Sequence, residues 1–239
     1  MSKFSNEIGW IQLGKKYSDY TLEDLLGPLN EVERKYAPKR LFVSGELTIP
    51  LPSPRASIIG SRKASSKGLE ATKFIAKTLV KEKAVIVSGL AEGIDTAAHE
   101  TAIEEGGNTI AVLGTSLDKF YPKKNTLLQE IIMRHHLAIS QFPVGYPTQR
   151  KNFVIRNRLM ALISDASIIV EAGNTSGSLH QGWEALRLGR PLFIWHSILK
   201  NTDLIWTKKM LQYGAMILTD PNEVLESLPT SGRILMVTP

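Results

Sequence analysis

Residues 57–68 read SIIGSRKASSKG, and this stretch decides the fold. An apolar run leads into Gly60, a serine and two cations follow at once, and the residues from Ser65 onward are typical of a helix start. A strand that runs through a glycine and a basic loop into a helix often binds a phosphate, because loop amides and the helix dipole both favour an anion. The stretch therefore predicts a strand–loop–helix unit with an anion site at its loop.

The rest of the chain repeats this alternation of short apolar runs and longer amphipathic runs. The short runs are rich in Ile and Val and lack regular polar alternation, which is typical of strands covered on both faces of a parallel sheet. We expect strands at Ala56–Gly60, Ala84–Ser88, Thr109–Leu113, Ala138–Ser140, Ser167–Glu171, Pro191–Trp195 and Ala215–Leu218. We expect helices at Ser65–Glu82, Ile94–Glu105, Asn125–His135, Phe153–Ser164, Ser178–Leu188 and Asp203–Gln212. The pattern predicts an α/β fold, Rossmann-like and doubly wound, with a mostly parallel sheet.

The first 50 residues do not follow this pattern. They contain an acidic helix candidate at Thr21–Leu29, a possible edge strand at Leu41–Val43 and the beginning of a proline-rich linker. We predict three parts, namely an N-terminal extension with a short helix and a linker (1–50), a Rossmann-like core (51–228) and a C-terminal tail (229–239).

Composition limits the class of protein. The 239 residues carry a net charge of +6, which is moderately basic and equally typical of an ordinary globular protein, so the placement of the cations matters more than their number. The chain has no cysteine, which excludes disulfides and thiolate metal sites, and we expect no metal. The N-terminus has no apolar signal-peptide region, and no apolar run approaches the roughly 20 residues of a membrane span. We expect a cytoplasmic protein without a membrane partner.

Four of the expected strands end in loops that contain glycine. These loops are Gly60–Arg62, Gly89–Gly93, Gly114–Ser116 and Ala172–Ser178. The carboxyl ends of parallel strands meet at one edge of the sheet, so the loops should lie together. A single such loop has an ordinary structural explanation, but four at one edge favour a phosphate-binding edge. Neither the G-x-G-x-x-G fingerprint nor the Walker A motif is present, and we expect no cofactor.

Basic residues follow the same strands. They are Arg62 and Lys63 after the first strand, Lys119, Lys123 and Lys124 after the third, and Arg150, Lys151, Arg156 and Arg158 before the fifth. Cations at helix starts are unfavourable unless an anion lies between them, so this pattern favours a polyanion over a single phosphate. Arg156 and Arg158 are two residues apart and point to nearly opposite sides of a regular helix, so both cannot bind one phosphate.

Four segments carry a collinear set of motifs, namely GSRKASSKG, SGLAEGIDTAAHETAIEEGGNTIAVLGTSLDKFYPKKN, FVIRNRLMALISDASIIVEAGNTSGSL and EALRLGRPLF. Together they resemble the DprA/Smf family of DNA-processing proteins, and the resemblance covers roughly residues 35 to 195. It implies a Rossmann-like core that binds single-stranded DNA without a cofactor. It also implies a homodimer that loads a RecA-type recombinase in natural transformation and DNA recombination.

The sequence differs from the family's pattern at several positions. Val154 and Ile155 stand where the family has a proline before its R-N-R triplet, and Trp195-His196-Ser197 replaces a Pro-Gly turn. Many members begin with a helix-hairpin-helix-type domain and end with a winged helix. Against those members, this chain resembles a minimal or divergent one.

The glycine-containing loops and the family's motifs together predict the DNA-binding residues. We expect phosphate or base contacts from Gly60, Ser61, Arg62, Lys63, Gly89, Gly114, Arg156, Asn157, Arg158, Ser176, Gly177 and Ser178. Aromatic side chains commonly stack on single-stranded bases. Candidates for that role here are Phe120, Tyr121 and Phe153.

Candidate catalytic groups have simpler structural explanations. Asp95 and His99 are four residues apart on a helix and can pair, either as a helix cap or as an acid–base dyad. Glu171 ends a strand at the ligand edge, where it could bind a ribose hydroxyl or act as a base. Related Rossmann-like nucleosidases use P-G-G-x-G-T-x-x-E, and Gln181 stands at the position of that glutamate. We therefore expect no catalytic residue.

These observations favour a non-catalytic protein that binds single-stranded DNA, protects strands and assists recombinase loading. A nucleotide-binding sensor or a nucleotide-hydrolysing enzyme of the nucleosidase group is the alternative, and dependence of affinity on oligonucleotide length discriminates between them. Too little chain follows the late strands to cover all their apolar residues, which predicts a homodimer at that sheet edge. The residues concerned are Trp195, Ile198, Leu199, Leu204, Ile205 and Trp206.

Overall fold

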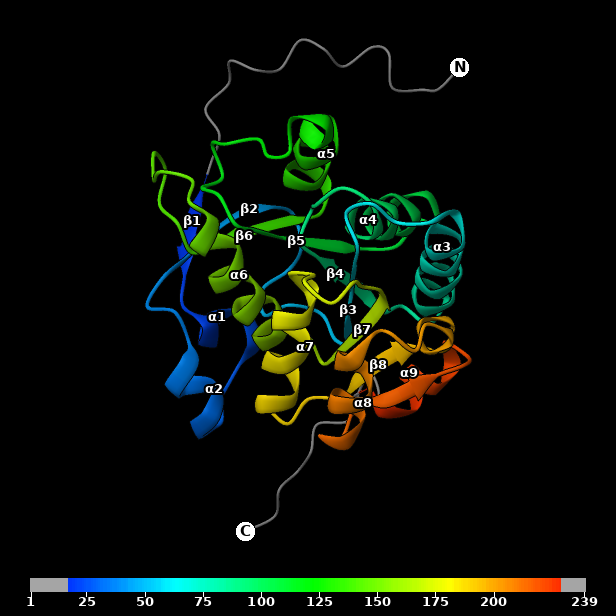
Figure 1. Cartoon of the computed structure of the whole chain (residues 1–239). Helices are drawn as coiled ribbons and strands as arrows, with labels where there is room; N and C mark the ends of the chain where they lie inside the picture. Colours follow the sequence, from blue (N-terminus) through cyan, green and yellow to red (C-terminus); the bar gives the residue numbers. More distant parts are fainter. Residues whose placement is uncertain (1–16, 229–239) are drawn as a thin grey trace, which may run out of the picture.

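The computed structural model of the protein describes residues 17–228, in which a central sheet is covered by helices (Figure 1). In this part of the chain the strands form one sheet in the order β1-β2-β6-β5-β4-β3-β7-β8-β9. The strands are β1 (Ser18–Tyr20), β2 (Leu41–Gly45), β3 (Arg55–Gly60), β4 (Val85–Ser88), β5 (Thr109–Leu113), β6 (Leu137–Ser140), β7 (Ala166–Glu171), β8 (Leu192–Trp195) and β9 (Met216–Leu218). β2 runs antiparallel to β1 and β6, and every other neighbouring pair is parallel.

Helices connect these strands as the sequence predicts. They are α1 (Leu22–Leu26), α2 (Glu31–Tyr36), α3 (Ser66–Lys81), α4 (Ile94–Glu104), α5 (Thr126–His135), α6 (Arg150–Ile163), α7 (Ser178–Arg187), α8 (Ile205–Gln212) and α9 (Asn222–Ser227), with 3-10 turns η1 (Lys123–Asn125) and η2 (His196–Lys200). The seven strands expected from Ala56 onward lie within one residue of their observed ends, β2 extends two residues beyond the expected Leu41–Val43, and the expected Rossmann-like, mostly parallel fold is confirmed. Among the described residues, no helix is long and apolar enough to cross a membrane.

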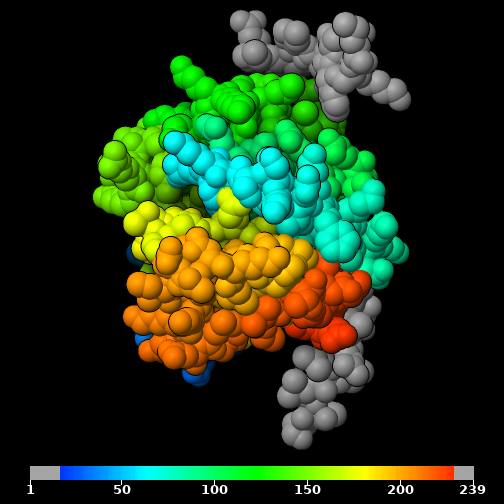
Figure 2. Space-filling view, turned by 45° about the vertical axis from the view of Figure 1, so that its right-hand side comes forward, coloured from blue at the N-terminus to red at the C-terminus, as the bar shows by residue number. Residues whose placement is uncertain are grey.

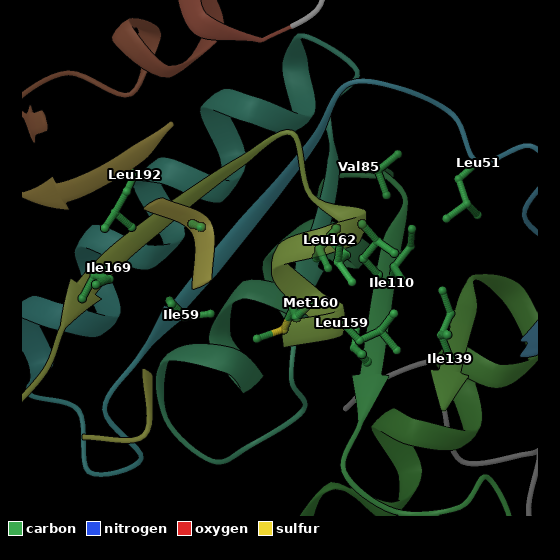
Figure 3. Close-up of a cluster of buried hydrophobic side chains, with 14 of the residues drawn as sticks. Leu51, Ile59, Val85, Ile110, Ile139, Leu159, Met160, Leu162, Ile169 and Leu192 are labelled. Carbon is green, nitrogen blue, oxygen red and sulfur yellow. The ribbon is translucent and has the colours of Figure 1, made fainter. Parts of the chain in front are cut away.

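Both faces of the strands from β3 to β8 are buried, which explains why these strands are continuously apolar. On one face, residues of α1, α6, α7 and α8 pack against the sheet, and Figure 3 shows Met160 and Leu162 of α6 among strand residues such as Ile110. On the other face, residues of α3, α4 and α9 pack against Ile58 and Ile168. Successive strand residues point to opposite faces, so Ile168 and Ile169 enter different clusters. The fold is doubly wound.

The N-terminal segment is more closely joined to the sheet than the sequence predicts. β2 is not an edge strand, because β1 pairs with its outer side. The helix expected at Thr21–Leu29 ends early and a second helix, α2, follows, while Leu22 and Leu25 are buried in the core. The boundary expected at residue 50 therefore does not separate the sheet. The expected tail at 229–239 and the start of the extension at 1–16 lie outside the described residues.

The order of the strands fixes where a ligand should bind. From β3 the chain adds β4, β5 and β6 on one side, and then β7, β8 and β9 on the other. Connections therefore leave the carboxyl ends of β3 and β7 in opposite directions, and a crevice opens between them. Open α/β sheets bind ligands at this switch point.

Candidate nucleic-acid interface

A pocket of about 580 Å³ opens at the carboxyl ends of β3 and β7. Four segments line it: the loop after β3, the chain between β4 and α4, the inner side of α6 and the loop that leads from β7 into α7. Figure 2 shows the cyan segment after β3 beside the yellow segment after β7 on one face of the molecule. The volume lies within the range of about 300–1,000 Å³ that small-ligand sites occupy.

The loop after β3 presents the two cations that the sequence predicts. Gly60, Ser61, Arg62 and Lys63 all line the pocket, and Arg62 and Lys63 are exposed. The Ser61 amide donates to the Glu171 carbonyl oxygen over 2.7 Å, which joins the loop to the end of β7. The structure therefore places the G-S-R-K segment at the pocket with its charged side chains accessible to solvent.

The start of α3 differs from the expectation, because a carboxylate of the protein already occupies it. The Ser65 hydroxyl accepts from the Gly68 amide at 3.1 Å, so Ser65 is the N-cap. The Glu171 carboxylate in turn accepts from the Ser65 amide at 3.1 Å and from the Ser65 hydroxyl at 2.5 Å. Glu171 therefore interacts with the helix start, and its carboxylate is engaged rather than available as a base or a ribose ligand.

The loop before α7 supplies small polar groups on the opposite wall. Ser176, Gly177 and Ser178 line the pocket, and the two serine hydroxyls lie 2.6 Å apart. α7 begins at Ser178, so its positive dipole end lies at this wall. Hydroxyls and a helix start on one side and two cations on the other form an arrangement that suits a phosphate.

Arg156 is placed differently from the expected phosphate contact. It is 5% exposed, and its Nη1 donates to the carbonyl oxygens of Gly89 and Val112. A Cβ at Gly89 would lie 2.0 Å from that nitrogen, so Gly89 makes room for the guanidinium. Burial lowers the pKa of Arg156, and the negative charge of Asp95 opposes that shift. Arg156 thus ties the ends of β4 and β5 to α6, and it also contributes to the pocket wall.

Asn157 extends this connection to the other wall. Its Oδ1 accepts from Arg156 Nε at 3.0 Å, and its Nδ2 donates to the Gly177 carbonyl oxygen at 2.9 Å. Asn157 is 6% exposed and lines the pocket. The side chains of Arg156 and Asn157 therefore hold the ends of β4 and β5 and the α7 loop in one arrangement.

Arg158 points away from the pocket. It donates to the Glu184 carboxylate on α7 at 3.2 and 3.3 Å, and its guanidinium lies 5.5 Å from the Tyr36 ring centroid. The expected divergence of Arg156 and Arg158 is present, although neither side chain is a free cation at the pocket. Gly114 also differs from the expectation, because it lies behind the wall against Phe153.

Aromatic rings gather at the rim between Arg62 and Arg156. The Phe153 ring lines the pocket, with the guanidinium carbons of Arg62 and Arg156 at 5.9 and 6.0 Å from its centroid. The Tyr121 ring lies 5.4 Å from the Phe153 ring, and Tyr121 is 46% exposed. Tyr121 and Phe153 are therefore placed together, and Tyr121 has a surface free for stacking.

The suspected acid–base dyad does not form. His99 Nδ1 bonds to the Thr109 hydroxyl at 2.6 Å, and that hydroxyl donates its proton to the Ile86 carbonyl oxygen, so Nδ1 is the donor to Thr109. The Asp95 carboxylate instead accepts from the Ala91 amide at 3.3 Å. Burial lowers the pKa of His99 to about 3, which keeps the ring neutral. Asp95 therefore binds the loop before α4, and His99 joins the middle of α4 to β5.

The position of the nucleosidase glutamate also has no acid. Gln181 is fully buried beneath the pocket, where its Nε2 donates to the Ser57 hydroxyl at 2.6 Å. Within residues 17–228, no group of three or more acidic or histidine side chains could hold a metal ion. The sequence alone shows that Gln181 replaces the glutamate of the nucleosidase motif. Nothing in the sequence predicts the hydrogen bonds made by Asn157 and Glu171.

Comparison with known proteins finds relatives that match most of the chain. A family model described as DNA recombination-mediator protein A matches residues 17–229. The DNA processing protein DprA of Streptococcus pneumoniae is 37% identical over 211 residues, which are 88% of this chain and 74% of that protein. The X-ray structure of S. pneumoniae DNA processing protein A has a TM-score of 0.75 at 32% identity, covering 90% of this chain and 75% of that one. A Helicobacter pylori DNA processing protein A, described for its single-stranded DNA binding mode, has a TM-score of 0.71 at 29% identity, covering 90% and 97%.

Proposed function

The chain belongs to the DNA recombination-mediator protein A family, the DprA/Smf proteins of DNA processing, and from that premise we propose that it binds single-stranded DNA at the pocket between β3 and β7. The related H. pylori protein is described for binding single-stranded DNA, which supports the same ligand here. Binding requires no chemistry from the pocket, and we propose that the protein acts without catalysis.

The observation that carries this proposal is the charge and polarity of the pocket wall. Its charged residues are Arg62, Lys63, Arg156 and Asp95, and the two exposed ones are both cations. Burial raises the pKa of Asp95, while the positive charge of Arg156 opposes that shift and offsets the repulsion between Asp95 and a phosphate. The hydroxyls at the start of α7 complete a site that attracts an anion on two sides.

Further cations at the same sheet edge extend this site beyond one nucleotide. Lys123 and Lys124 are exposed before α5, and Arg150 and Lys151 are exposed at the start of α6. A single phosphate would not need these residues, whereas a strand that passes several of them can place a phosphate at each. We therefore propose that a polynucleotide, with a base stacked on Tyr121, is the ligand.

We also propose that the protein is a homodimer that assists a RecA-type recombinase. The proposal of a recombinase partner rests on the family resemblance alone. For the dimer, the apolar edge is smaller than expected, because Trp195, Ile198 and Trp206 are only 6–7% exposed and belong to the core. Ile205, which is 75% exposed, remains, together with Tyr213, Met216 and Ile217 at 67%, 40% and 44%. These four define the α8–β9 edge as the proposed dimer contact.

Fluorescence anisotropy with labelled oligothymidylates of about 5 to 40 nucleotides tests the ligand, because sites for single strands span several nucleotides. We expect affinity to rise with length until the basic edge is filled, and a mononucleotide to compete poorly. Equal affinity for a mononucleotide and a long strand would contradict the proposal and favour a small-nucleotide sensor. Release of free base from a nucleotide would instead reveal a nucleosidase.

A further inference from the structure

We propose that Glu171 is a positioning residue that holds the basic loop 61–65 in the shape that presents Arg62 and Lys63 to DNA. The inference rests on the proposed function and adds to it a residue that does not itself line the pocket. The negatively charged carboxylate of Glu171 does not attract a polyanion, so Glu171 would affect DNA binding through the loop that it holds. Its contacts with the loop support that role.

Glu171 bonds both ends of the loop. Its backbone carbonyl oxygen accepts from the Ser61 amide at 2.7 Å. Its carboxylate accepts from the Ser65 amide at 3.1 and 3.2 Å and from the Ser65 hydroxyl at 2.5 Å. One residue therefore fixes the first and last positions of the segment that carries Arg62 and Lys63.

Glu171 is held in place by the sheet. Glu171 is the last residue of β7, whose preceding residues are buried, and it pairs with Gly60 after a register shift between Ile59 and Gly60. The shift brings Glu171 opposite the point where the chain leaves β3. The loop is consequently attached to the sheet itself, and its cations keep a defined place before any ligand arrives.

Gly68 leaves the space that the carboxylate needs. A Cβ at this position would lie 2.5 Å from Glu171 Oε2 and 3.1 Å from Glu171 Cδ. Because these atoms are the far end of a flexible side chain, an added methyl group would push the carboxylate away rather than disrupt the backbone. Ser65, Gly68 and Glu171 thus form one unit, although Glu171 is far from the other two in the sequence.

Charge and positioning make opposite predictions for this residue. A carboxylate near a polyanion site repels the ligand, so removal of its charge alone should strengthen binding. If Glu171 positions the loop, its removal should weaken binding, because Arg62 and Lys63 would no longer be held in place. The direction of the change therefore separates the two roles.

The test compares Glu171→Ala and Glu171→Gln in anisotropy titrations with a long oligothymidylate over a range of salt. We expect the alanine variant to bind about tenfold more weakly, with a salt slope smaller by about 0.7 for each phosphate that the cations no longer neutralise. The glutamine variant keeps the shape and a carbonyl acceptor for Ser65, and we expect it to restore most of the affinity. Alanine-variant affinity equal to or above that of the unchanged protein would overturn the inference.

Gly68→Ala is the matched variant that changes no charge. Alanine favours a helix over glycine by about 1 kcal/mol, so we expect an unchanged or higher melting temperature together with weaker binding. Unchanged binding by this variant would also overturn the inference, and it decides the matter if Glu171→Ala does not fold. If the unchanged protein fails to bind any strand, the proposed function itself is wrong and this inference falls with it.

Discussion

Arg156 and Arg158 illustrate how two residues of one motif acquire different roles. Arg156 is buried and donates to the carbonyl oxygens of Gly89 and Val112, whereas Arg158 lies on the far side of α6 beside Glu184. The guanidinium of Arg156 holds the site together through its bonds to carbonyl oxygens. The guanidinium of Arg158 is paired with Glu184 on another face of α6 and does not reach the pocket. Arg62, which is exposed at the pocket, is therefore the arginine that should contribute most to direct phosphate binding.

Arg62→Ala and Arg158→Ala form a matched pair that tests this assignment. We expect Arg62→Ala to weaken strand binding by about 1.5–3 kcal/mol, the range for a hydrogen bond to a charged group, and to lower the salt slope by about 0.7. Arg158→Ala removes the same charge and should leave both quantities nearly unchanged. Anisotropy titrations of the two variants provide the comparison. A loss of affinity in Arg158→Ala as large as that in Arg62→Ala would show that distance from the pocket does not matter.

His99 predicts a pH dependence of stability. Its folded-state pKa is about 3, against an ordinary value of 6.5, because burial disfavours the charged ring. The unfolded chain therefore binds a proton that the folded chain does not, so this contribution is complete above pH 6.5 and is lost as the pH falls toward the folded pKa. Below pH 6.5, the free energy of unfolding should fall by up to about 1.4 kcal/mol per pH unit from this residue.

Denaturant unfolding between about pH 7 and pH 5 measures this effect, since most carboxylates stay ionised there. His99→Gln removes the titrating ring, and its stability should change less with pH than that of the unchanged protein. Identical pH profiles of the two proteins would mean that the pKa of His99 is the same in the folded and unfolded chains, and would contradict a pKa lowered by burial.

At the scale of elements, α6 organises the pocket. Its Arg156 reaches the ends of β4 and β5, its Asn157 reaches the loop before α7, and its Phe153 lies between Arg62 and Arg156. Loops at a sheet edge are attached only at their ends, so a helix that bonds several of them sets their relative positions. This role depends on buried hydrogen bonds rather than on charge at the surface.

Asn157→Asp and Asn157→Leu test the role of α6. The aspartate keeps an acceptor for Arg156 but removes the donor to Gly177, whereas the leucine removes both bonds and leaves Arg156 Nε unpaired. We expect the leucine variant to lose about 1–3 kcal/mol of stability and the aspartate variant less, and both to bind strands more weakly. Melting curves and titrations together measure the two effects. Full strand affinity in a stable leucine variant would contradict the role assigned to Asn157.

The elements also explain which parts of the structure could be predicted. The strands from β3 to β8 can be predicted because burial on both faces makes them continuously apolar, and β9 because Met216–Leu218 is itself an apolar run. The sequence does not predict β1, since Ser18–Tyr20 is short, half-exposed and polar. α6 begins three residues before its predicted start, because Arg150, Lys151 and Asn152 carry no apolar signal.

For the site, the carboxyl ends of parallel strands lie at one edge of the sheet. The sequence alone therefore predicts that Arg62, Lys63 and Ser176–Ser178 lie near one another. The partners of Arg156 could not be predicted in this way. They are backbone carbonyl oxygens of Gly89 and Val112, and any sequence supplies such groups. The same holds for Glu171, whose hydrogen bond with Ser65 spans 106 positions of the chain.

At the scale of the whole molecule, the α8–β9 edge is the proposed dimer interface. β9 is the last strand of the described sheet, and Met216 and Ile217 on it are half-exposed. An edge strand with free backbone groups and apolar side chains favours pairing with another chain. Two copies would place two basic edges on one strand, with the second binding event taking place at high effective concentration.

Ile217→Lys tests the dimer, with Leu127→Lys on α5 as a control at the opposite side of the sheet. Both residues are exposed, at 44% and 59%, so neither change should unfold the monomer. We expect sedimentation of the unchanged protein and of the control to show a dimer at micromolar concentration, and Ile217→Lys to show a monomer that binds long strands more weakly. A dimer that survives Ile217→Lys would place the interface elsewhere.

The central claim is that the edge at β3 and β7 binds a polyanionic strand through exposed cations, and the salt dependence of binding tests it most directly. Anisotropy titrations with a long oligothymidylate from about 50 to 200 mM salt yield the slope of log K against log salt. Arg62 and Lys63 alone predict a slope of about −1.4, and the further exposed lysines and arginines predict a steeper one. A slope near zero would contradict the account, because a strand held by phosphate contacts must release counterions as it binds.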